Sequence, residues 1–288
     1  MDNPIEPLFE TFEEDFLKIS SYDSSFANNP KNKDKELLKS ICSFIDLTTL
    51  NVTDSSETVH LFCDKAKQFS VEHPQMPNVT AVCTYPVFAS VLDSALRGTG
   101  IKRAVVIGSF PSSQTFLDIK LAEAKKAIAF GVDELDYVMS VGEFLEGNYE
   151  FVGSEISAIK NVAGDIKLKV IIESGILPDN ESIWRASLLA MECGADFIKT
   201  STGKVSQSAS PEAAWIIAHA IKAYYLKRDR KIGFKVSGGI SSVDEATIYY
   251  GIVKSLLGED WLVPDYFRIG ASRLADNLLN YINSSPAD

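Results

Sequence analysis

From about residue 40 onward, short apolar runs alternate with longer segments whose apolar residues recur at helical spacing. This alternation is typical of repeated strand and helix units that build a parallel sheet. The predicted strands span residues 41–47, 79–84, 103–108, 134–139, 167–172, 195–200, 232–236 and 266–270. Because eight parallel strands with intervening helices close on themselves, the pattern predicts an α/β fold, a (β/α)8 TIM barrel.

The run at residues 167–173 indicates which face of a strand is internal. Leu168 and Val170 share one face, and Lys169 and Glu173 share the other, because side chains alternate along a strand. The face that helices cover must be apolar, so we expect Lys169 and Glu173 to point into the barrel.

Alternation also indicates the interior face of two further strands, but it does not do so for a third. It places Lys235 inside the strand at 232–236, and it places Asp136 on the interior face together with Glu134. The run at 195–200 has no clean apolar side. Alternation alone therefore does not place Lys199.

Helices are predicted between the strands, one of them at 114–130. Others begin at capping residues, namely Asp54 or Ser55, Ser210 before a proline, and Ser242.

Residues 1–40 differ from the rest of the chain. A helix is predicted from Ile5 to Ile19, and we interpret the polar residues 20–35 as a loose linker. The predicted organisation is thus an N-terminal helical extension with its linker, residues 1–40, followed by a barrel domain, residues 41–288.

Composition narrows the choice of partners and compartment. A formal net charge of −11 argues against nucleic acid or an anionic membrane as the main partner. No apolar run approaches the roughly 18 residues of a membrane span, and the acidic start lacks the features of a signal peptide. We therefore expect a cytoplasmic protein that does not bind membranes.

Cysteine and histidine positions give little support for a metal site. The four cysteines form no CxxC pair, and the three histidines fall in predicted helices or in loops at helix ends. No metal ligand is predicted, and the cysteines are expected to be reduced.

Lysines and carboxylates gather in the predicted strands or at their C-terminal ends, where barrel enzymes place their active sites. The candidates are Asp46, Cys83, Asp136, Lys169, Lys199 and Lys235. One interpretation is a structural network of ion pairs. The other is amine catalysis, because an amine beside a second ammonium loses proton affinity and can then form a Schiff base with a carbonyl. Cys83 has no strand-end histidine to activate it, so we interpret it as a core or pocket-wall thiol.

Glycine-rich stretches follow the last two strands, at 237–240 and 268–273. Loops in these positions, together with a helix N-terminus, commonly bind phosphate in such barrels. The predicted anion-binding positions are Gly203, Lys204, Gly238, Gly239 and Ser272. Each stretch alone could be an ordinary turn, but their joint position favours phosphate. The phosphate-binding motifs GxxxxGK[ST] and strand-linked GxGxxG are absent from the sequence.

Several stretches together resemble the deoxyribose-phosphate aldolase family, from about Phe44 to Asn280. They are FIDLTTLN at 44–51, AVCTYP at 81–86, GVDELDYV at 131–138, LKVIIESG at 168–175, GADFIKTSTGK at 194–204 and GFKVSGGI at 233–240. GADFIKTSTGK is by far the most specific of them.

The resemblance implies a role for each matching residue. Lys199 would face inward and form the Schiff base, Lys235 would depress its proton affinity, and Asp136 would relay protons. The supporting network and substrate pocket would include Asp46, Cys83, Lys169 and Thr200.

The implied reaction is the reversible cleavage of 2-deoxy-D-ribose 5-phosphate into acetaldehyde and D-glyceraldehyde 3-phosphate. The resemblance implies no metal or organic cofactor, and a homodimer is the family-level expectation.

Three positions depart from the family pattern. Val236 stands where a small residue or proline is usual, and Arg273 stands where a serine is common. Arg273 either contacts the phosphate or faces solvent. Some family members carry a catalytic tyrosine in a mobile tail, and whether Tyr281 acts in this way stays open.

Other functions are also compatible with the residue pattern. A lysine-dependent aldolase for a ketose phosphate would keep Lys199 and differ in its donor substrate. A non-catalytic barrel that binds a phosphosugar would bind ligand without turnover, and a metal-dependent aldolase would need a chelator-sensitive centre.

Overall fold

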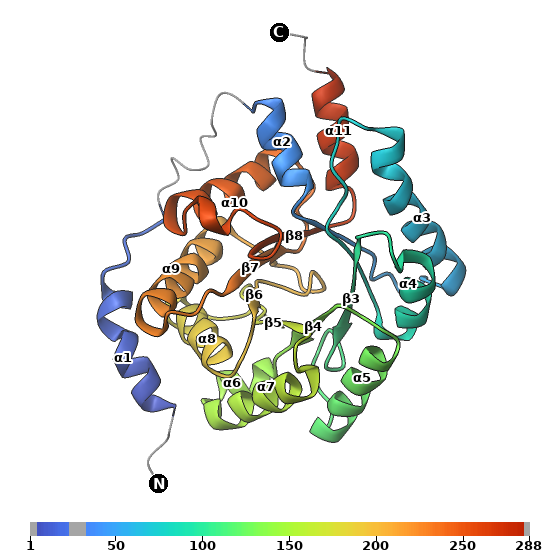
Figure 1. The fold of residues 1–288 in the computed structure, drawn as a ribbon. Coiled ribbons are helices and arrows are strands. Elements are labelled where there is room, and N and C mark those ends of the chain that lie inside the picture. Colours follow the sequence, from blue (N-terminus) through green and yellow to red (C-terminus); the bar gives the residue numbers. More distant parts are fainter. Residues whose placement is uncertain (1–4, 23–32, 285–288) are drawn as a thin grey trace.

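A computed structural model describes residues 5–22 and 33–284 of the chain. Eight parallel strands form a closed barrel in which each strand pairs with the next and β8 pairs with β1 (Figure 1). The strands are β1 (Ile45–Thr48), β2 (Ala81–Thr84), β3 (Lys102–Ile107), β4 (Glu134–Val138), β5 (Lys167–Ile171), β6 (Phe197–Lys199), β7 (Gly233–Ser237) and β8 (Phe267–Ala271). The predicted TIM barrel is confirmed.

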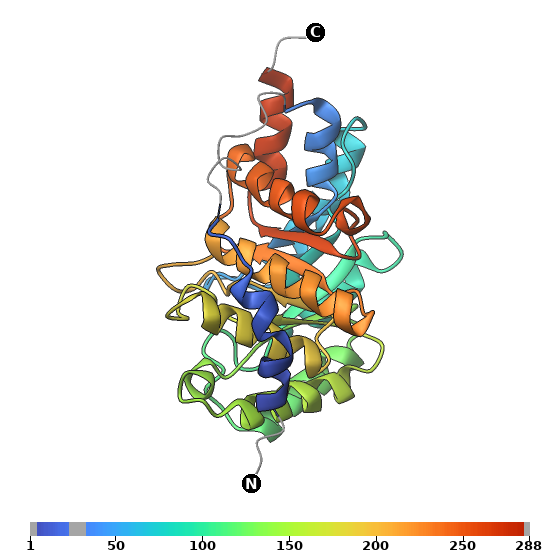
Figure 2. The ribbon, with the colours of Figure 1, turned by 90° about the vertical axis from the view of Figure 1, so that its left-hand side faces the viewer.

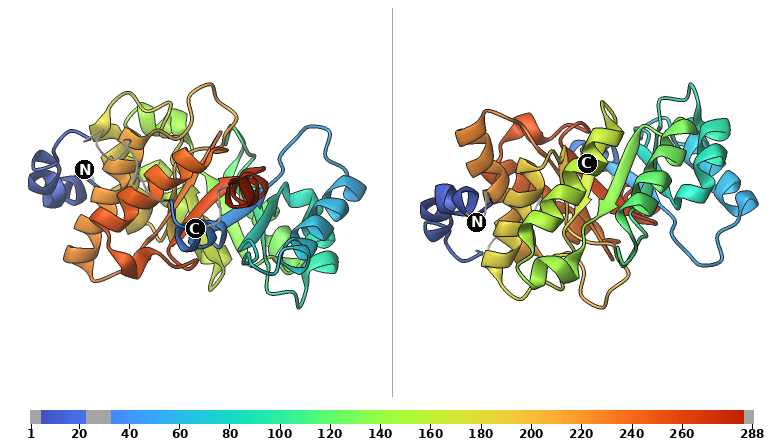
Figure 3. Two further views of the ribbon diagram at one scale, coloured as in Figure 1. Left: turned by 90° about the horizontal axis from the view of Figure 1, so that it is seen from above. Right: turned by 90° about the horizontal axis from the view of Figure 1, so that it is seen from below.

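Helices surround the barrel (Figure 1), and the views from above and below show helices on both sides of the strands (Figure 3). The α-helices are α1 (Glu6–Leu17), α2 (Lys35–Cys42), α3 (Ser56–Glu72), α4 (Ala89–Leu96), α5 (Leu117–Ala129), α6 (Val141–Leu145), α7 (Tyr149–Ala163), α8 (Asn180–Glu192), α9 (Pro211–Arg228), α10 (Val243–Leu256) and α11 (Leu274–Ser284). Short 3-10 helices in the described part of the chain are η2 (Pro86–Phe88) and η3 (Glu259–Trp261).

The predicted helix starts at Ser55, Ser210 and Ser242 are confirmed. Each of these side chains accepts a hydrogen bond from the backbone N–H three residues further on, which satisfies one of the free donors at the start of the helix. Among the described residues, no helix is long and apolar enough to cross a membrane.

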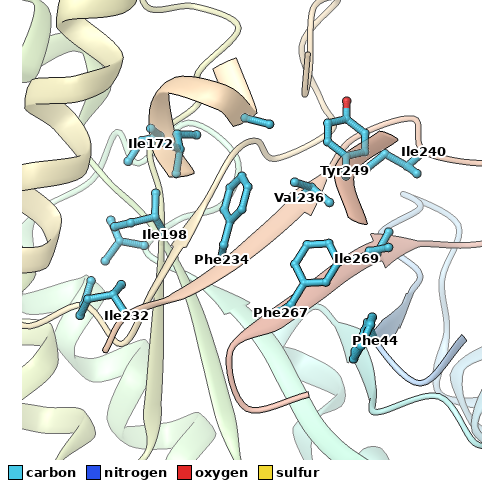
Figure 4. Close-up of a cluster of buried hydrophobic side chains, with 14 of the residues drawn as sticks. Phe44, Ile172, Ile198, Ile232, Phe234, Val236, Ile240, Tyr249, Phe267 and Ile269 are labelled. Carbon is cyan, nitrogen blue, oxygen red and sulfur yellow. The ribbon is translucent and has the colours of Figure 1, made fainter. Parts of the chain in front are cut away.

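The outer face of the sheet is apolar, as alternation predicts. Figure 4 shows Phe234 and Val236 of β7 beside Ile198 of β6 and Ile269 of β8, all fully buried. This packing turns Lys235, which lies between Phe234 and Val236, toward the barrel interior, as predicted. It also fixes the alternation in β6, because an outward Ile198 turns its neighbours on the strand inward.

The interior face of β6 carries Phe197 and Lys199. An aromatic ring fits there because Gly233 is its neighbour in β7, and a Cβ atom at Gly233 would lie only 2.3 Å from the Phe197 ring. Phe197 is the reason that the sequence of this strand shows no clean apolar side. The remaining interior around β2 and β3 is filled by a small apolar cluster of Ala81, Cys83, Ala104 and Val106.

The predicted start of the first strand, at residue 41, is wrong. Ile41 and Cys42 end α2, and the strand begins at Ile45. Ile41 and Cys42 are buried as part of the apolar side of an amphipathic helix, and a short apolar run does not by itself distinguish a strand from a helix. The helix α2 also crosses the predicted boundary at residue 40.

Helix α1 lies along the outer surface of α8 and α9 (Figures 1 and 2). Phe12 is fully buried and stacks on Tyr224 of α9, with ring centroids 6.1 Å apart, and Phe16 contacts Trp184 of α8. The extension is thus a further helical layer on one side of the barrel. Most of the predicted linker lies outside the described residues, and the division into two domains stays a prediction.

Candidate active site

Asp136 of β4 is the centre of a buried cluster inside the barrel. Its Oδ1 atom accepts a hydrogen bond from Lys169 of β5 at 2.8 Å. Its Oδ2 atom accepts hydrogen bonds from Lys199 of β6 and Lys235 of β7, also at 2.8 Å each. Parallel pairing places Asp136 beside Lys169 and Lys199 beside Lys235, so four consecutive strands bring these groups together.

A second set of buried charges lies around Asp46 of β1. Lys235 is 2.5 Å from Asp46, and Arg268 of β8 is 2.6 Å from the other oxygen of the same carboxylate. Arg268 also contacts Glu134 at 2.7 Å, and Glu134 is 2.6 Å from Lys169. The two clusters therefore form one continuous network around the barrel interior.

Arg268 and Glu134 are parts of the network that were absent from our predicted site residues. Glu134 shares the predicted interior face with Asp136, and Arg268 alternates with Gly270 in β8. The sequence signal that could have identified Arg268 was therefore its position on the same face of the last strand as Gly270.

The charges of this network balance only if one amine is neutral. Three buried carboxylates, Asp46, Glu134 and Asp136, face four buried basic side chains, Lys169, Lys199, Lys235 and Arg268. Lys102 approaches Glu134 from the surface, at 3.8 Å. An additional uncompensated charge in a buried network is costly, so the basic group with the fewest carboxylate contacts is the one expected to lose its proton.

Lys199 is that group, because it contacts a single carboxylate. Burial lowers the pKa of Lys199; the nearby Asp136 raises it, the ammonium of Lys235 lowers it, and the net shift is downward from 10.5. The environment therefore favours the neutral amine that nucleophilic attack requires.

The pKa values of the other two lysines in the network, Lys169 and Lys235, shift in the opposite direction. Burial lowers the pKa of Lys235, but Asp136 and Asp46 more than offset this effect, so the net pKa is raised. Burial also lowers the pKa of Lys169, but Asp136 and Glu134 more than offset this effect, so its net pKa is raised as well. Burial alone would raise the pKa of Asp136, yet the three lysines around it hold that pKa well below 3.8. These shifts favour the charged forms of Lys169 and Lys235 and the ionised form of Asp136.

Cys83 and Thr200 lie close to the catalytic candidates but have different surroundings. The sulfur of Cys83 is 3.9 Å from Asp136, and burial raises the pKa of the thiol to about 11. Thr200 exchanges hydrogen bonds with the backbone of Ser237 and so ties β6 to β7. Both are buried supports of the network rather than parts of the cavity wall.

A cavity of about 490 Å3 opens at the C-terminal ends of β1, β6, β7 and β8. Lys199 is the member of the charged network that reaches it, and all five predicted anion-binding residues line it. The cavity lining comprises Thr48, Thr49, Leu50, Asn51, Asp54, Thr58, Phe62, Lys199, Thr202, Gly203, Lys204, Ser237, Gly238, Gly239, Ile240, Ser241, Gly270, Ala271, Ser272 and Arg273. Residues from the β1–α3 loop, among them Asn51 and Asp54, were not predicted to take part.

The cationic groups of the cavity are placed around the glycine-rich loops. The ammonium of Lys204 donates a hydrogen bond to the carbonyl of Leu50, across the cavity mouth. Arg273 lines the cavity beside Ser272 and is exposed, immediately before α11. Tyr281 lies within α11 and is not part of the cavity lining. Within the described ranges, no group of three or more His, Cys, Asp or Glu side chains is arranged to hold a metal ion.

Residues 41–255 match the model of a protein family described as DeoC/LacD family aldolase. The match covers well over half of the 288 residues. The chain belongs to the DeoC/LacD family of aldolases. It is therefore an aldolase, and the buried lysine cluster lies where the active site of a barrel enzyme is expected.

Relatives of this aldolase match over most of their length. The deoxyribose-phosphate aldolase of Homo sapiens is 37% identical over 252 residues, which covers 84% of this chain and 79% of the human protein. A Caenorhabditis elegans relative is 37% identical over 263 residues, covering 91% of this chain and 86% of its own length. A solved structure of the deoxyribose phosphate aldolase from Aeropyrum pernix, described as tetrameric, is 26% identical with a TM-score of 0.67, covering 88% and 99% of the two chains.

Proposed function

We propose that this aldolase cleaves 2-deoxy-D-ribose 5-phosphate reversibly into acetaldehyde and D-glyceraldehyde 3-phosphate, through a Schiff base on Lys199. The observation that carries the proposal is the position of Lys199. Its amine reaches the cavity, whereas the charged groups that set its proton affinity lie below it in the barrel. The names of the human and Aeropyrum pernix relatives support this substrate.

The first half of the reaction uses the neutral amine of Lys199. The nitrogen attacks the aldehyde carbon of the open-chain sugar, and loss of water leaves a protonated imine. A base then removes the proton of the C3 hydroxyl, and the C2–C3 bond breaks. The electron pair of that bond moves into the imine, which becomes an enamine as D-glyceraldehyde 3-phosphate leaves.

The second half returns the enzyme to its starting state. Protonation of the enamine carbon restores the imine, and water hydrolyses it to release acetaldehyde and the free amine of Lys199. We assign the proton transfers to Asp136 acting with Lys235 and a water molecule. Both groups lie within hydrogen-bond distance of each other, and Asp136 contacts the Lys199 nitrogen directly.

The phosphate of the substrate would bind at the other end of the cavity. We assign it to the backbone amides of Gly238, Gly239 and Ser272 together with the ammonium of Lys204. The positive φ angles of Gly203, Gly238 and Gly239 allow these loops to turn their amides toward a single anion. Arg273 lines the same cavity and would add a second cation to this subsite.

Borohydride reduction in the presence of acetaldehyde tests the proposal. The imine on Lys199 should be reduced to a stable two-carbon adduct, and peptide mass mapping should locate that adduct on Lys199. A matched control is Lys254→Leu, an exposed lysine of α10 whose loss should leave labelling unchanged. An active enzyme with unmodified Lys199 would contradict the mechanism. Turnover with dihydroxyacetone phosphate in place of acetaldehyde as the donor would indicate a ketose-phosphate aldolase instead.

A further inference from the structure

Glu173 occupies an unusual position at the C-terminal end of β5. Its φ angle is +52°, which is strained for a residue with a side chain, and the residue is only 4% exposed. Such strain persists only where surrounding contacts hold the residue in place. The network around Asp136 does not include Glu173, so the contacts that hold it must serve another part of the structure.

The carboxylate of Glu173 holds the start of the β6–α9 loop. It accepts a hydrogen bond from the backbone N–H of Thr202 at 3.0 Å and another from the Thr202 hydroxyl at 2.5 Å. The same hydroxyl accepts a hydrogen bond from the backbone N–H of Lys204 at 3.1 Å. A continuous chain of hydrogen bonds therefore runs from a buried carboxylate to the residue whose ammonium reaches across the cavity.

The later part of the same loop, at Gln207 and Ser208, packs against two glycines. A Cβ atom at Gly175 would lie 2.0 Å from the carbonyl oxygen of Gln207, and one at Gly238 would lie 2.4 Å from the Cβ of Ser208. The β6–α9 loop therefore lies closely against the segments that follow β5 and β7, and a side chain at either glycine would displace it. Two separate sets of contacts, one polar and one steric, fix the loop over the cavity.

We infer that Glu173 is a positioning residue for phosphate binding, which sets the place of Lys204 and Gly203 through Thr202. This inference rests on the proposed function, because it assigns the cation of Lys204 to the substrate phosphate. Glu173 does not line the cavity, so it acts through the loop rather than by touching substrate. Displacing a binding group by about 1 Å is enough to weaken its contact substantially.

Steady-state kinetics of Glu173→Gln tests the inference. In glutamine an amide nitrogen replaces the oxygen that accepts from the Thr202 hydroxyl, so this hydrogen bond to a carboxylate is lost and only a weaker one, from the amide N–H to the hydroxyl oxygen, can replace it. We expect KM for 2-deoxyribose 5-phosphate to rise about tenfold with kcat within about twofold of wild type, because the lost interaction concerns binding of the remote phosphate. For unphosphorylated 2-deoxyribose, kcat/KM should be unchanged.

Two further variants make the test decisive. Gly175→Ala displaces the same loop at Gln207 without removing a polar group, and it should show the same rise in KM. Glu123→Gln is the matched control, because Glu123 anchors a different loop by accepting hydrogen bonds from the backbone of Gly108 and Ser109, and its KM should not change.

The outcomes separate the two proposals. A wild-type KM in Glu173→Gln, or an equal loss on phosphorylated and unphosphorylated substrates, would overturn the positioning role. Absence of both cleavage activity and an acetaldehyde adduct in the wild-type enzyme would overturn the proposed function itself.

Discussion

At the scale of single residues, chemically identical lysines differ in proton affinity because their neighbours differ. Lys235 contacts two carboxylates and Lys199 contacts one, and both are buried. Desolvation therefore dominates for Lys199, whereas ion pairing dominates for Lys235. This difference of one carboxylate accounts for the opposite directions of the two pKa shifts, downward for Lys199 and upward for Lys235.

The charge of Lys235 should control the pH dependence of catalysis. In Lys235→Leu, the cation that lowers the pKa of Lys199 is lost, and Asp136 acts on Lys199 without compensation. The pKa of Lys199 should rise, so the acidic limb of the pH–activity profile, on which activity increases with pH, should move to higher pH. At neutral pH the active fraction should fall about tenfold for each unit of the rise.

The profile of kcat/KM against pH for Lys235→Leu and for the exposed-site control Lys254→Leu measures this effect. An unchanged profile in Lys235→Leu would contradict the assigned role. The variant should also be less stable by about 3–5 kcal/mol, because removing one partner of a buried ion pair leaves the other uncompensated.

At the scale of secondary-structure elements, the sequence predicted most strands well, and it failed where local patterns are ambiguous. Alternation predicted the interior face of β5 and β7, because their outward positions are consistently apolar. It could not place Lys199 in β6, because the apolar ring of Phe197 occupies the interior there. The space for this ring comes from Gly233 on the neighbouring strand, and contacts between strands are not part of a local pattern.

Helix α1 should contribute to stability through its buried side. Phe12→Ala removes a fully buried ring that stacks on Tyr224. This variant should lower the free energy of unfolding by about 3–5 kcal/mol. Leu17 lies in the same helix, but its side chain is 74% exposed. Leu17→Ala should therefore change the free energy of unfolding by no more than about 0.5 kcal/mol. Urea unfolding of the two variants provides the comparison. Equal stabilities would show that α1 does not contribute to the fold.

At the scale of the whole molecule, the charged interior couples stability to pH. Asp46, Glu134 and Asp136 are buried, yet the cations around them lower the pKa of each below its ordinary value of 3.8 or 4.5. A carboxylate whose pKa is lower in the folded state contributes stability above its unfolded pKa. That stability is lost as the pH falls below about 4.5 toward the folded values.

The same linkage acts in the opposite direction at alkaline pH. The pKa values of Lys169 and Lys235 are raised above 10.5, so their stabilising contribution is present below pH 10.5 and declines as the pH rises further. Urea unfolding at a series of pH values should therefore show a plateau near neutrality and a steep loss below pH 4.5. A free energy of unfolding that does not change between pH 7 and pH 3 would contradict the folded-state charges.

The sequence by itself determined the barrel, the inward direction of Lys169 and Lys235, and the loops after β6, β7 and β8 that line the cavity. Strand alternation, glycine-rich stretches and the family resemblance are local features, so they can be read without knowing how the strands meet. Only the tertiary structure showed that Arg268 and Glu134 join the network, and that Glu173 anchors the loop of Lys204. These contacts depend on closure of the barrel and on the stagger between strands, which bring together side chains that are far apart in sequence.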